Sequence, residues 1–481
     1  MMAYLPMHDG IAAHARWRRL THIGISWLRR GPHTVAALQW ASMPHRIRRF
    51  LAVALVFAAP LAAEVRQLTI LHTNDLHARL MPLSNGRGGF AYLAATIRRE
   101  RANCGHCILL NAGDLVQGTP VSTLFHGLPV YEIANLFGYD AATLGNHEFD
   151  YGWMQARKFV ETATYPVVTA NLMNNADELF TSKPYAILEV NGLRVAVIGG
   201  ITDDLPTLTS PKAMGDWHPL PVVQTVRKYA AELLGKADLI VLLAHINDAE
   251  EQAVLNSVPE IAVSITGHIH EGLAEAKSHD GRVLVRMKCY GEDLGRLDLQ
   301  VDTAAGKLAD WKWKQVPVDP AAIAPAADVA ALVKQWEARV KELVDRPLAA
   351  SRRAFTEAEV KTLVERALRD QTGADFAFMN AGSIRDSLPQ GQLLERHIWN
   401  IMPFDNAVVV GTFKGKDLPA VVLGERKVDP NRDYTLAVSD FTASNQASDE
   451  NLRTTGLKFP NDVGQMRDLI LDWFRKKKVI E

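Results

Sequence analysis

The chain has 481 residues, of which 48% are hydrophobic and 22% are charged. It is therefore long enough to bury large cores and to form two or three domains. Basic and acidic residues nearly cancel, giving a formal net charge of −1 at pH 7. This balance argues against a nucleic-acid scaffold, which needs an excess of Lys and Arg to contact many phosphates. A small anionic ligand would need a local source of positive charge, such as bound metal ions.

A secretory signal peptide is predicted at residues 43–63. Arg46, Arg48 and Arg49 precede an apolar run over residues 50–59, and Pro60-Leu61-Ala62-Ala63 follows, with cleavage expected after Ala63. The run is shorter than the roughly 20 residues that cross a bilayer, so no permanent membrane anchor is expected. Because signal peptides begin near the start of translation, residues 1–42 are interpreted as a non-native or unstructured extension. The mature protein should be secreted, with the periplasm as the expected compartment.

Cys104 and Cys107 form a C-x-x-C pair, and Cys289 stands alone. After export the pair fits a small local disulfide. A redox-active pair is disfavoured because such a pair should open a helix, whereas Cys107 leads into an apolar run. A zinc knuckle with His106 is disfavoured because no second ligand pair exists.

From residue 67 to about residue 316, short β-branched runs alternate with helical stretches. This pattern predicts an α/β first domain over residues 64–316. Asn191-Gly192 lies between two apolar runs at 186–190 and 194–198, which predicts a tight hairpin and hence some antiparallel pairing. Further strands are predicted at residues 68–72, 108–111, 167–170, 239–244 and 262–266.

A Pro- and Ala-rich loop and a helix over residues 327–344 are interpreted as a connector over residues 317–345. Thr356 and Glu359 then form a capping-box pattern, so a helix should run from there to Asp370 before Gly373 ends it. A second, smaller α/β (α+β) domain is expected over residues 346–481.

Five short motifs carry the chemistry of the first domain. Asp75, Asp114, His245 and His268 each follow an apolar run at once, and ligand sites of open α/β sheets lie beyond the carboxyl ends of strands. Carboxylate, amide and imidazole donors suit Mn, Fe, Zn or Co, and two such ions about 3.5–4 Å apart favour hydrolysis of a phosphoester. In order, the motifs are Asp75-Leu76-His77, Gly113-Asp114, Gly145-Asn146-His147-Glu148, His245 and Gly267-His268-Ile269-His270.

We expect Asp114 to bridge the two ions, because one carboxylate can bind both. The coordination of one ion would be completed by Asp75, His77 and His270. The coordination of the other would be completed by Asn146, His245 and His268. His147 is placed at the leaving group, where Asp150 would orient its ring and raise its pKa. Glu148 would hold the turn or a hydrogen bond behind the ligands. The remaining histidines are predicted to be surface or packing residues: His72, His106, His126, His218, His279 and His397.

These motifs resemble those of the secreted 5'-nucleotidase family of calcineurin-like metallophosphoesterases. The resemblance covers nearly the whole mature chain and rests on L-H-T-N-D-L-H ending at His77, A-G-D-L-V-Q-G around Asp114, G-N-H-E-F-D at 145–150 and G-H-I-H at 267–270. It implies an N-terminal metallophosphoesterase α/β sandwich, a C-terminal substrate-binding domain and the metal ligands given above. It also implies a catalytic pair, His147 and Asp150.

The resemblance extends to N-A-G-S-I-R at 380–385 and M-P-F-D-N at 402–406. It implies that Arg385 contacts phosphate, that Phe404 stacks on a base and that Asn406 hydrogen-bonds near the base. The family often carries a G-G-D-G-Y-like segment that supplies a second aromatic, and residues 439–446 depart from it. Phe459 is taken as the substitute.

The sequence thus predicts an exported hydrolase that removes phosphate from nucleotides by attack of a metal-bound hydroxide. On the same metal site, a 2',3'-cyclic-nucleotide phosphodiesterase with 3'-nucleotidase activity, a UDP-sugar hydrolase and a sulfur-oxidation thiosulfohydrolase remain as alternatives. A non-catalytic nucleotide-binding receptor is an alternative of another class. A small nucleotide or other phosphoester is the expected partner, not a nucleic-acid polymer. Members of the family reorient the C-terminal domain, so a hinge is expected at residues 317–350.

Overall fold

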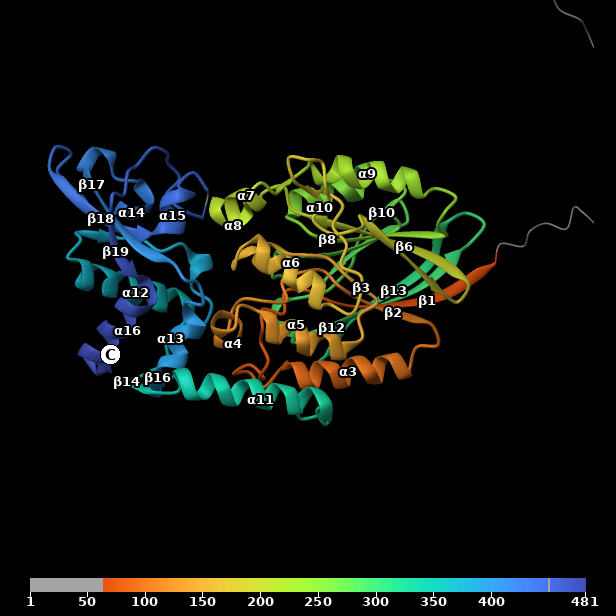
Figure 1. Ribbon diagram of the computed structural model, residues 1–481, viewed down its shortest axis with the longest axis horizontal. Coiled ribbons are helices and arrows are strands. Elements are labelled where there is room, and N and C mark those ends of the chain that lie inside the picture. The colour runs from red at the N-terminus through yellow and green to blue at the C-terminus, as the bar shows by residue number, and fades with distance from the viewer. Residues whose placement is uncertain (1–63, 449) are drawn as a thin grey trace, which may run out of the picture. The chain divides into compact units, whose positions relative to one another are not determined.

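The computed structural model describes residues 64–448 and 450–481 (Figure 1). The predicted extension and signal peptide lie outside the described residues. Two sheets form the centre of the N-terminal domain, with strand orders β13-β12-β1-β2-β3 and β10-β11-β9-β8-β6-β5. In the first sheet β1, β2 and β3 are parallel, and in the second β6, β8, β9 and β11 are parallel.

The strands of the first sheet are β1 (Val65–Thr73), β2 (Cys107–Asn111), β3 (Ala141–Ala142), β12 (Asp293–Asp302) and β13 (Lys307–Pro317). Those of the second are β5 (Tyr185–Val190), β6 (Leu193–Ile201), β8 (Leu239–His245), β9 (Val263–Gly267), β10 (Lys277–His279) and β11 (Arg282–Arg286). The short strands β4 (Leu172–Met173) and β7 (His218–Pro219) pair with each other.

The alternation of side chains along each strand produces a layered sandwich. In β1, Leu68 and Ile70 join an apolar cluster shared with strands of both sheets, whereas Leu71 points to the other face and packs with helices. Helices α3 (Phe90–Ala102), α5 (Leu128–Ala134) and α6 (Trp153–Thr162) cover the first sheet, and α9 (Val222–Leu233) and α10 (Asp248–Ser257) cover the second. Figure 1 shows α9 and α10 above the sheets and α3 and α5 below them. The predicted α/β sandwich is confirmed.

Most of the predicted strands are present. The hairpin is confirmed, because Val190 pairs with Leu193 and the turn residues Asn191 and Gly192 have φ values of 52° and 67°. The strand predicted at residues 167–170 is wrong: Val167 forms only an isolated bridge to Ala142. This run is apolar because it is buried, but its amides bond in turn to β3, to a threonine hydroxyl and to β6 rather than to one neighbouring strand.

The C-terminal domain contains two further sheets, in the orders β16-β14-β20 and β15-β18-β17-β19. Their strands are β14 (Pro347–Ser351), β15 (Phe376–Ala377), β16 (Gly391–Leu394), β17 (Ala407–Lys414), β18 (Asp433–Ser439), β19 (Asn461–Gln465) and β20 (Val479–Ile480). Thr356 and Glu359 cap α12 (Glu357–Thr372) reciprocally and Gly373 ends it with a φ of 71°, so this helix is confirmed. Apolar residues of α12 and α16 (Met466–Lys477) share one core with residues from both sheets.

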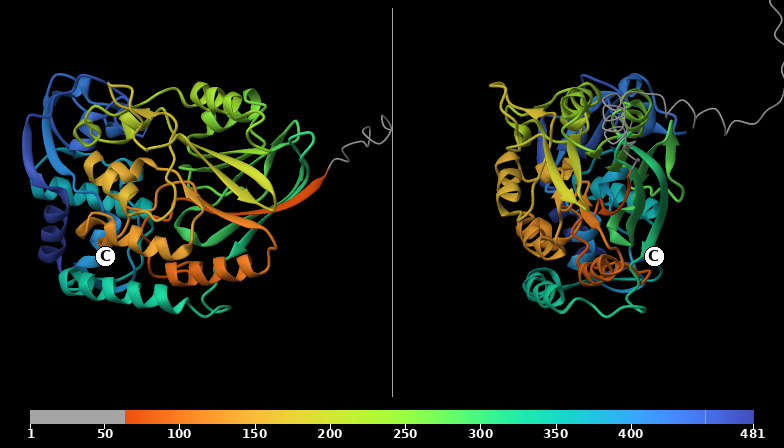
Figure 2. Two further views of the ribbon diagram at one scale, coloured as in Figure 1. Left: turned by 45° about the vertical axis from the view of Figure 1, so that its right-hand side comes forward. Right: turned by 90° about the vertical axis from the view of Figure 1, so that its right-hand side faces the viewer.

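Helix α11 (Ala327–Val344) is also confirmed. It lies alongside α3, as Figures 1 and 2 both show, and Val329, Val333 and Val340 pack into the same core as that helix. The remaining helices are α4 (Pro120–Leu124), α7 (Leu205–Leu208), α8 (Pro211–Met214), α13 (Glu395–Ile401), α14 (Ala420–Leu423) and α15 (Asp440–Ser444), together with 3-10 turns at Asn135–Phe137, Asn146–Phe149, Cys289–Gly291, Ala381–Ser383 and Gly415–Asp417.

Cys104 and Cys107 form a disulfide just before the apolar part of β2, and Cys289 is buried as a free thiol. Across the described ranges, none of the helices combines the length and the apolar character that a membrane span requires.

Candidate active site

The predicted metal ligands lie in loops at the carboxyl ends of strands from both sheets of the sandwich. Asp75 follows β1, Asp114 follows β2, Asn146 follows β3, His245 is the last residue of β8 and His268 follows β9. Because parallel strands end at one edge, these residues meet although they are far apart in the sequence.

The loop backbone is unusual at most of these positions. Asp75, His77, Asp114, His268 and His270 have φ values of 50°, 47°, 54°, 87° and 64°. Left-handed conformations of residues other than glycine cost about 1–3 kcal/mol each and persist where the surrounding structure enforces them, often at functional sites. The strain therefore marks this edge as the functional end of the sandwich.

The glycines of the motifs allow the loops to approach one another. A Cβ atom at Gly145 would overlap the Asp114 carboxylate. A Cβ atom at Gly267 would lie 2.8 Å from Nδ1 of His245 and 3.0 Å from Oδ2 of Asp75. Larger residues at these two positions would push the donors apart, which explains why a glycine precedes Asn146 and His268.

The donor atoms converge closely. One ligand atom from each of Asp75, His77, Asp114 and His270 lies within 4.8 Å of all the others, and Nε2 of His77 is 2.8 Å from Nε2 of His270. Nε2 of His245 is 3.1 Å from Oδ2 of Asp114, which places a second set of donors on the same carboxylate.

His268 and Asn146 complete the cluster. The amide of His268 donates to both carboxylate oxygens of Asp75 at 3.0 Å, and its ring centroid is 5.1 Å from that of His245. Asn146 lines the same cavity as Asp114, His268 and His270. The structure thus places all seven predicted ligands at one edge of the sandwich, and the donor atoms of Asp75, His77, Asp114 and His270 form one cluster there.

The pKa shifts of three of the four histidines in the ligand set suit a bound cation. Burial lowers the pKa of His77 well below its ordinary value, and burial is also the main reason that the pKa values of His268 and His270 fall to about 3. These shifts favour the neutral rings of His77, His268 and His270, which is the form that binds a metal. Burial also lowers the pKa of His245, but the carboxylates of Asp114 and Asp75 outweigh it and raise this pKa to about 10, so a metal ion at Nε2 would have to displace a proton. Oδ1 of Asn146 is buried without a hydrogen-bond partner among the described residues. Such an atom carries a desolvation cost that a metal ion would offset, so the donor set fits divalent metal ions.

Neighbouring groups hold the donors in place. Nδ1 of His245 is 2.8 Å from the carbonyl oxygen of Ala112 and donates to it, which leaves Nε2 facing the site. The buried carboxylate of Glu148 accepts hydrogen bonds from the amides of Asp114, Leu115 and Gly145 at 3.1, 2.9 and 2.6 Å. Glu148 therefore joins the loops that carry Asp114 and Asn146.

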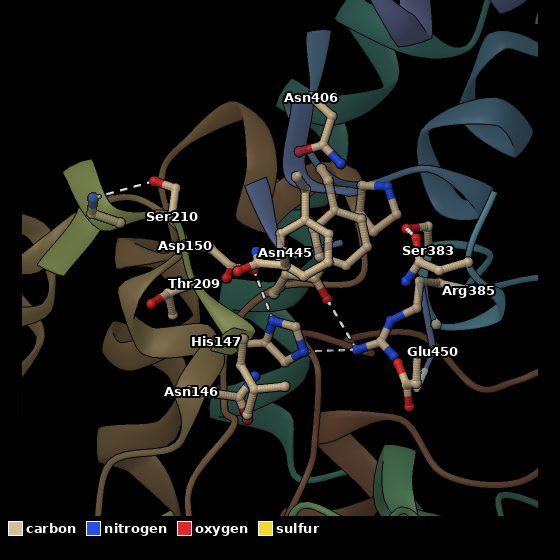
Figure 3. Close-up of a pocket in the computed structure, with 18 of the residues that line it drawn as sticks. Asn146, His147, Asp150, Thr209, Ser210, Ser383, Arg385, Asn406, Asn445 and Glu450 are labelled. Carbon is tan, nitrogen blue, oxygen red and sulfur yellow. Dashed lines mark hydrogen bonds and ion pairs between the residues drawn. The ribbon is translucent and has the colours of Figure 1, made fainter. Parts of the chain in front are cut away.

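His147 lies beside this cluster and contacts two further predicted site residues, as Figure 3 shows. Its Nδ1 is 2.8 Å from Oδ2 of Asp150, and its Nε2 is 3.0 Å from a guanidinium nitrogen of Arg385. Burial lowers the pKa of His147, but the carboxylates of Asp150 and Asp114 outweigh it, and the net shift is upward. Guanidinium nitrogens only donate, so Nε2 of His147 accepts from Arg385 in this contact. An anion between the two groups could accept from both, once the ring takes up a proton.

A cavity of about 640 Å³ joins the metal-ligand cluster to the C-terminal domain. Arg385, Phe404 and Asn406 all line it, with Phe404 having its ring centroid 5.9 Å from that of His147. Phe459 does not line it: this ring packs against Phe413, with a centroid distance of 5.3 Å.

Several residues that line the cavity were not foreseen as site residues. Phe441 reaches it from the first turn of α15, where Ser439 caps the helix. Gln117 and Asn445 also line it, each with a buried amide nitrogen that has no hydrogen-bond partner within the described ranges. The only sequence signal for Phe441 was its place in the segment that departs from the family pattern, next to Asp440.

Arg79, which follows the first motif, holds the Arg385 segment against the N-terminal domain. Its guanidinium donates to the backbone carbonyl of Arg385 at 2.7 Å and pairs with Asp386 at 3.1 Å, and it lies 4.7 Å from the centre of the Tyr290 ring. Thr123 adds a second contact, because its hydroxyl donates to the carbonyl of Pro403 at 2.9 Å. These contacts place Arg385 and Phe404 at the edge of the sandwich.

A sandwich that presents buried imidazole and carboxylate donors beside an arginine and a histidine–aspartate pair defines a metal-dependent hydrolase of phosphoric esters. A family model described as calcineurin-like phosphoesterase matches residues 68–272, and one described as the 5'-nucleotidase C-terminal domain matches residues 337–424. The chain belongs to the 5'-nucleotidase family of calcineurin-like metallophosphoesterases. Two divalent metal ions are its cofactors.

Individual relatives agree with this family. The chain is 27% identical to protein UshA of Yersinia enterocolitica over 446 residues, covering 79% of this chain and 81% of that protein. Its structure is similar to that of a 5'-nucleotidase precursor from Thermus thermophilus, with a TM-score of 0.78, 23% identity and coverage of 86% and 97%. It is also similar to the sulfate thiohydrolase SoxB of Thermus thermophilus, with a TM-score of 0.75, 17% identity and coverage of 86% and 94%. At these identities the two structures support the fold alone.

Proposed function

We propose that this enzyme is exported and removes phosphate from 5'-nucleotides. The observation that carries the proposal is the single cavity in which the metal-ligand cluster, Arg385 and two aromatic residues meet. A nucleotide has a phosphate at one end and a flat base at the other. The cavity has charged and metal-binding groups that suit the phosphate and aromatic rings that suit the base.

The phosphate end is assigned to the loops of the sandwich. Asp114 would bridge two ions, with Asp75, His77 and His270 on one and Asn146, His245 and His268 on the other. Two divalent ions there would neutralise the charge of the phosphoryl group and lower the pKa of a bound water toward neutrality. The arrangement of Asp114 supports this assignment, since its carboxylate is close to Nε2 of both His77 and His245.

His147 is assigned to the leaving group. Its Nδ1–H donates to Asp150, which fixes the ring and favours the protonated form, so that Nε2 can give a proton to the departing alkoxide. Arg385 would bind a phosphoryl oxygen. Its guanidinium donates to Nε2 of His147 at 3.0 Å, so the two groups face one point, and an anion there would accept from both when His147 is protonated.

The base is assigned to the aromatic part of the cavity. Phe404 and Phe441 both line it, and an aromatic face stacks on a nucleobase with about 1–3 kcal/mol. Asn406 lines the same region and has both a donor and an acceptor for a base edge. Phe441, and not Phe459, is therefore assigned as the second aromatic that contacts the base.

The domain division and the export are proposals of the same kind. The N-terminal domain would span residues 64–316, the connector 317–345 and the substrate-binding domain 346–481. Helix α11 of the connector packs on α3 of the first domain, so the connector would move together with that domain. This packing supports a hinge near the C-terminal end of α11. The basic and apolar pattern of residues 43–63 supports export to the periplasm without a membrane anchor.

The test is phosphate release by the mature chain starting at Glu64, with Mn²⁺ or Co²⁺, from AMP, a 2',3'-cyclic nucleotide, UDP-glucose and p-nitrophenyl phosphate. AMP should be the best substrate, and His147→Ala should lower kcat by about 10²–10⁴-fold. His279→Ala, at an exposed histidine, is the matched control. Activity restricted to the cyclic ester or to UDP-glucose would reassign the substrate, and a His147→Ala variant as active as the control would remove His147 from the mechanism.

A further inference from the structure

Gln117 is a buried residue of the cavity wall that the assignments above leave without a role. It lies three residues after Asp114 in the loop beyond β2, its exposed fraction is 1%, and its backbone has a φ of 69°. Burial of an amide side chain and a left-handed backbone each cost free energy. Their combination at Gln117 therefore points to a functional role for this residue.

The orientation of its amide follows from its neighbour. Oε1 of Gln117 lies 3.5 Å from a guanidinium nitrogen of Arg385, a long contact. Guanidinium nitrogens only donate, so the amide oxygen must face them and the NH₂ group must face elsewhere. That NH₂ group is buried and has no hydrogen-bond partner among residues 64–448 and 450–481. An unpaired buried donor costs about 1–3 kcal/mol, which a ligand oxygen could recover.

The surroundings identify the end of the cavity at which this donor lies. The same guanidinium nitrogen of Arg385 contacts Nε2 of His147 at 3.0 Å, so Gln117 and His147 flank one cation. The next residue, Gly118, passes so close to His77 that a Cβ atom there would lie 2.8 Å from the carbonyl oxygen of His77. The backbone amide of Gln117 is already paired with the hydroxyl of Ser122 at 2.9 Å, which anchors the loop. The free NH₂ group therefore belongs to the end of the cavity that holds the metal ligands.

We propose that the side-chain NH₂ group of Gln117 donates a hydrogen bond to a non-bridging oxygen of the phosphoryl group, while its carbonyl oxygen orients Arg385. The ligand class is a tetrahedral oxyanion, either the phosphoryl group of a substrate or free phosphate. This inference rests on the proposed phosphohydrolase function and adds to it a neutral donor, contributed by the sandwich, that acts beside the cation from the C-terminal domain.

Two substitutions separate the two parts of the role. Gln117→Glu keeps an acceptor for Arg385 but removes the donor, and Gln117→Met removes both at similar size. Gln252→Glu, at an exposed position of α10, adds the same charge away from the cavity and is the matched control. The readouts are kcat/KM for AMP and p-nitrophenyl phosphate, inhibition by orthovanadate and by inorganic phosphate, and metal content per chain.

A preorganised donor to a developing oxyanion contributes about 10²–10³ in rate. We expect Gln117→Glu to lower kcat/KM for both esters by about 100-fold or more and to weaken orthovanadate inhibition by a similar factor, with metal content unchanged. The decrease in kcat/KM should be smaller for Gln117→Met than for Gln117→Glu, because methionine adds no negative charge beside the phosphoryl group. Inhibition by inorganic phosphate should weaken as well if the free anion uses the same donor.

Three results would overturn the inference. If Gln117→Glu keeps kcat/KM within about twofold of the wild type with its metals bound, Gln117 only positions Arg385. If Gln117→Met keeps full activity, the residue has neither role. If both variants lose their metals, Gln117 supports the metal loop and does not bind the phosphoryl group. These results differ from failure of the proposed function, in which the wild type and Gln252→Glu would themselves release no phosphate.

Discussion

Removal of the Glu148 carboxylate should weaken both the fold and the metal site. This side chain is fully buried and accepts three backbone hydrogen bonds, from Asp114, Leu115 and Gly145. Oε2 accepts two of them and Oε1 accepts one. Glu148 is thus the acceptor that binds the Asp114 loop to the loop that carries Asn146.

The magnitude follows from the number of amides left unpaired. Glu148→Ala leaves three buried amides without their acceptor, at about 1–3 kcal/mol each. The total is a large share of the roughly 5–15 kcal/mol that stabilises a typical domain. Glu148→Gln can keep the two hydrogen bonds of Oε2, but its NH₂ group then faces the amide of Leu115. Its loss of unfolding free energy should therefore be about a third of the loss in Glu148→Ala. Because Asp114 and Asn146 would move, metal affinity should fall by about 10–100-fold.

The assay is urea unfolding of the metal-free mature chain, followed by competition for Zn²⁺ or Mn²⁺ with a chromogenic chelator. Glu275→Ala, at an exposed glutamate in the same domain, is the control. The control should be the most stable of the three variants, Glu148→Gln should be less stable and Glu148→Ala should be the least stable. The reasoning is refuted if Glu148→Ala unfolds within about 0.5 kcal/mol of the control and binds metal equally well.

Three further predictions concern other parts of the molecule. Burial lowers the pKa of His72 to about 3, whereas an unfolded histidine titrates near 6.5, so its stabilising contribution is complete above pH 6.5 and is lost as the pH falls toward 3. His72→Leu should therefore reduce the loss of unfolding free energy between pH 7.5 and pH 5 by about 2 kcal/mol, and an unchanged pH slope would contradict this. Phe441→Ala should raise KM for AMP by about tenfold and leave hydrolysis of glycerol 3-phosphate unchanged, while Phe459→Ala should alter neither; equal losses on both esters would rule out stacking. Arg79→Ala should lower kcat/KM by about tenfold at constant metal content, because Arg385 loses its hydrogen-bonded support, and full activity would show that the support is dispensable.

Local chemistry explains why much of the fold could be read from the sequence. The capping pair Thr356 and Glu359 and the terminal Gly373 fix both ends of α12 by contacts within a few residues. The Asn191-Gly192 turn tolerates a positive φ at both positions, so the hairpin was predictable as well. The motifs that contain Asp114 and His268 combine a strand end, a potential metal donor and an adjacent glycine, and all three features can be recognised from the sequence alone.

By itself, the sequence determined the α/β class, the two helices that it predicted, all of its predicted strands except residues 167–170, and the presence of potential metal donors just after strands. Only the tertiary structure decided which apolar run is a strand, since residues 167–170 are buried between layers without a continuous partner. It also decided that Phe441 and not Phe459 faces the cavity, that Arg79 supports Arg385, and that Gln117 presents an unpaired donor. These features depend on contacts between segments that are far apart in the chain, and no periodicity, cap or motif encodes which of several similar side chains the packing will turn inward.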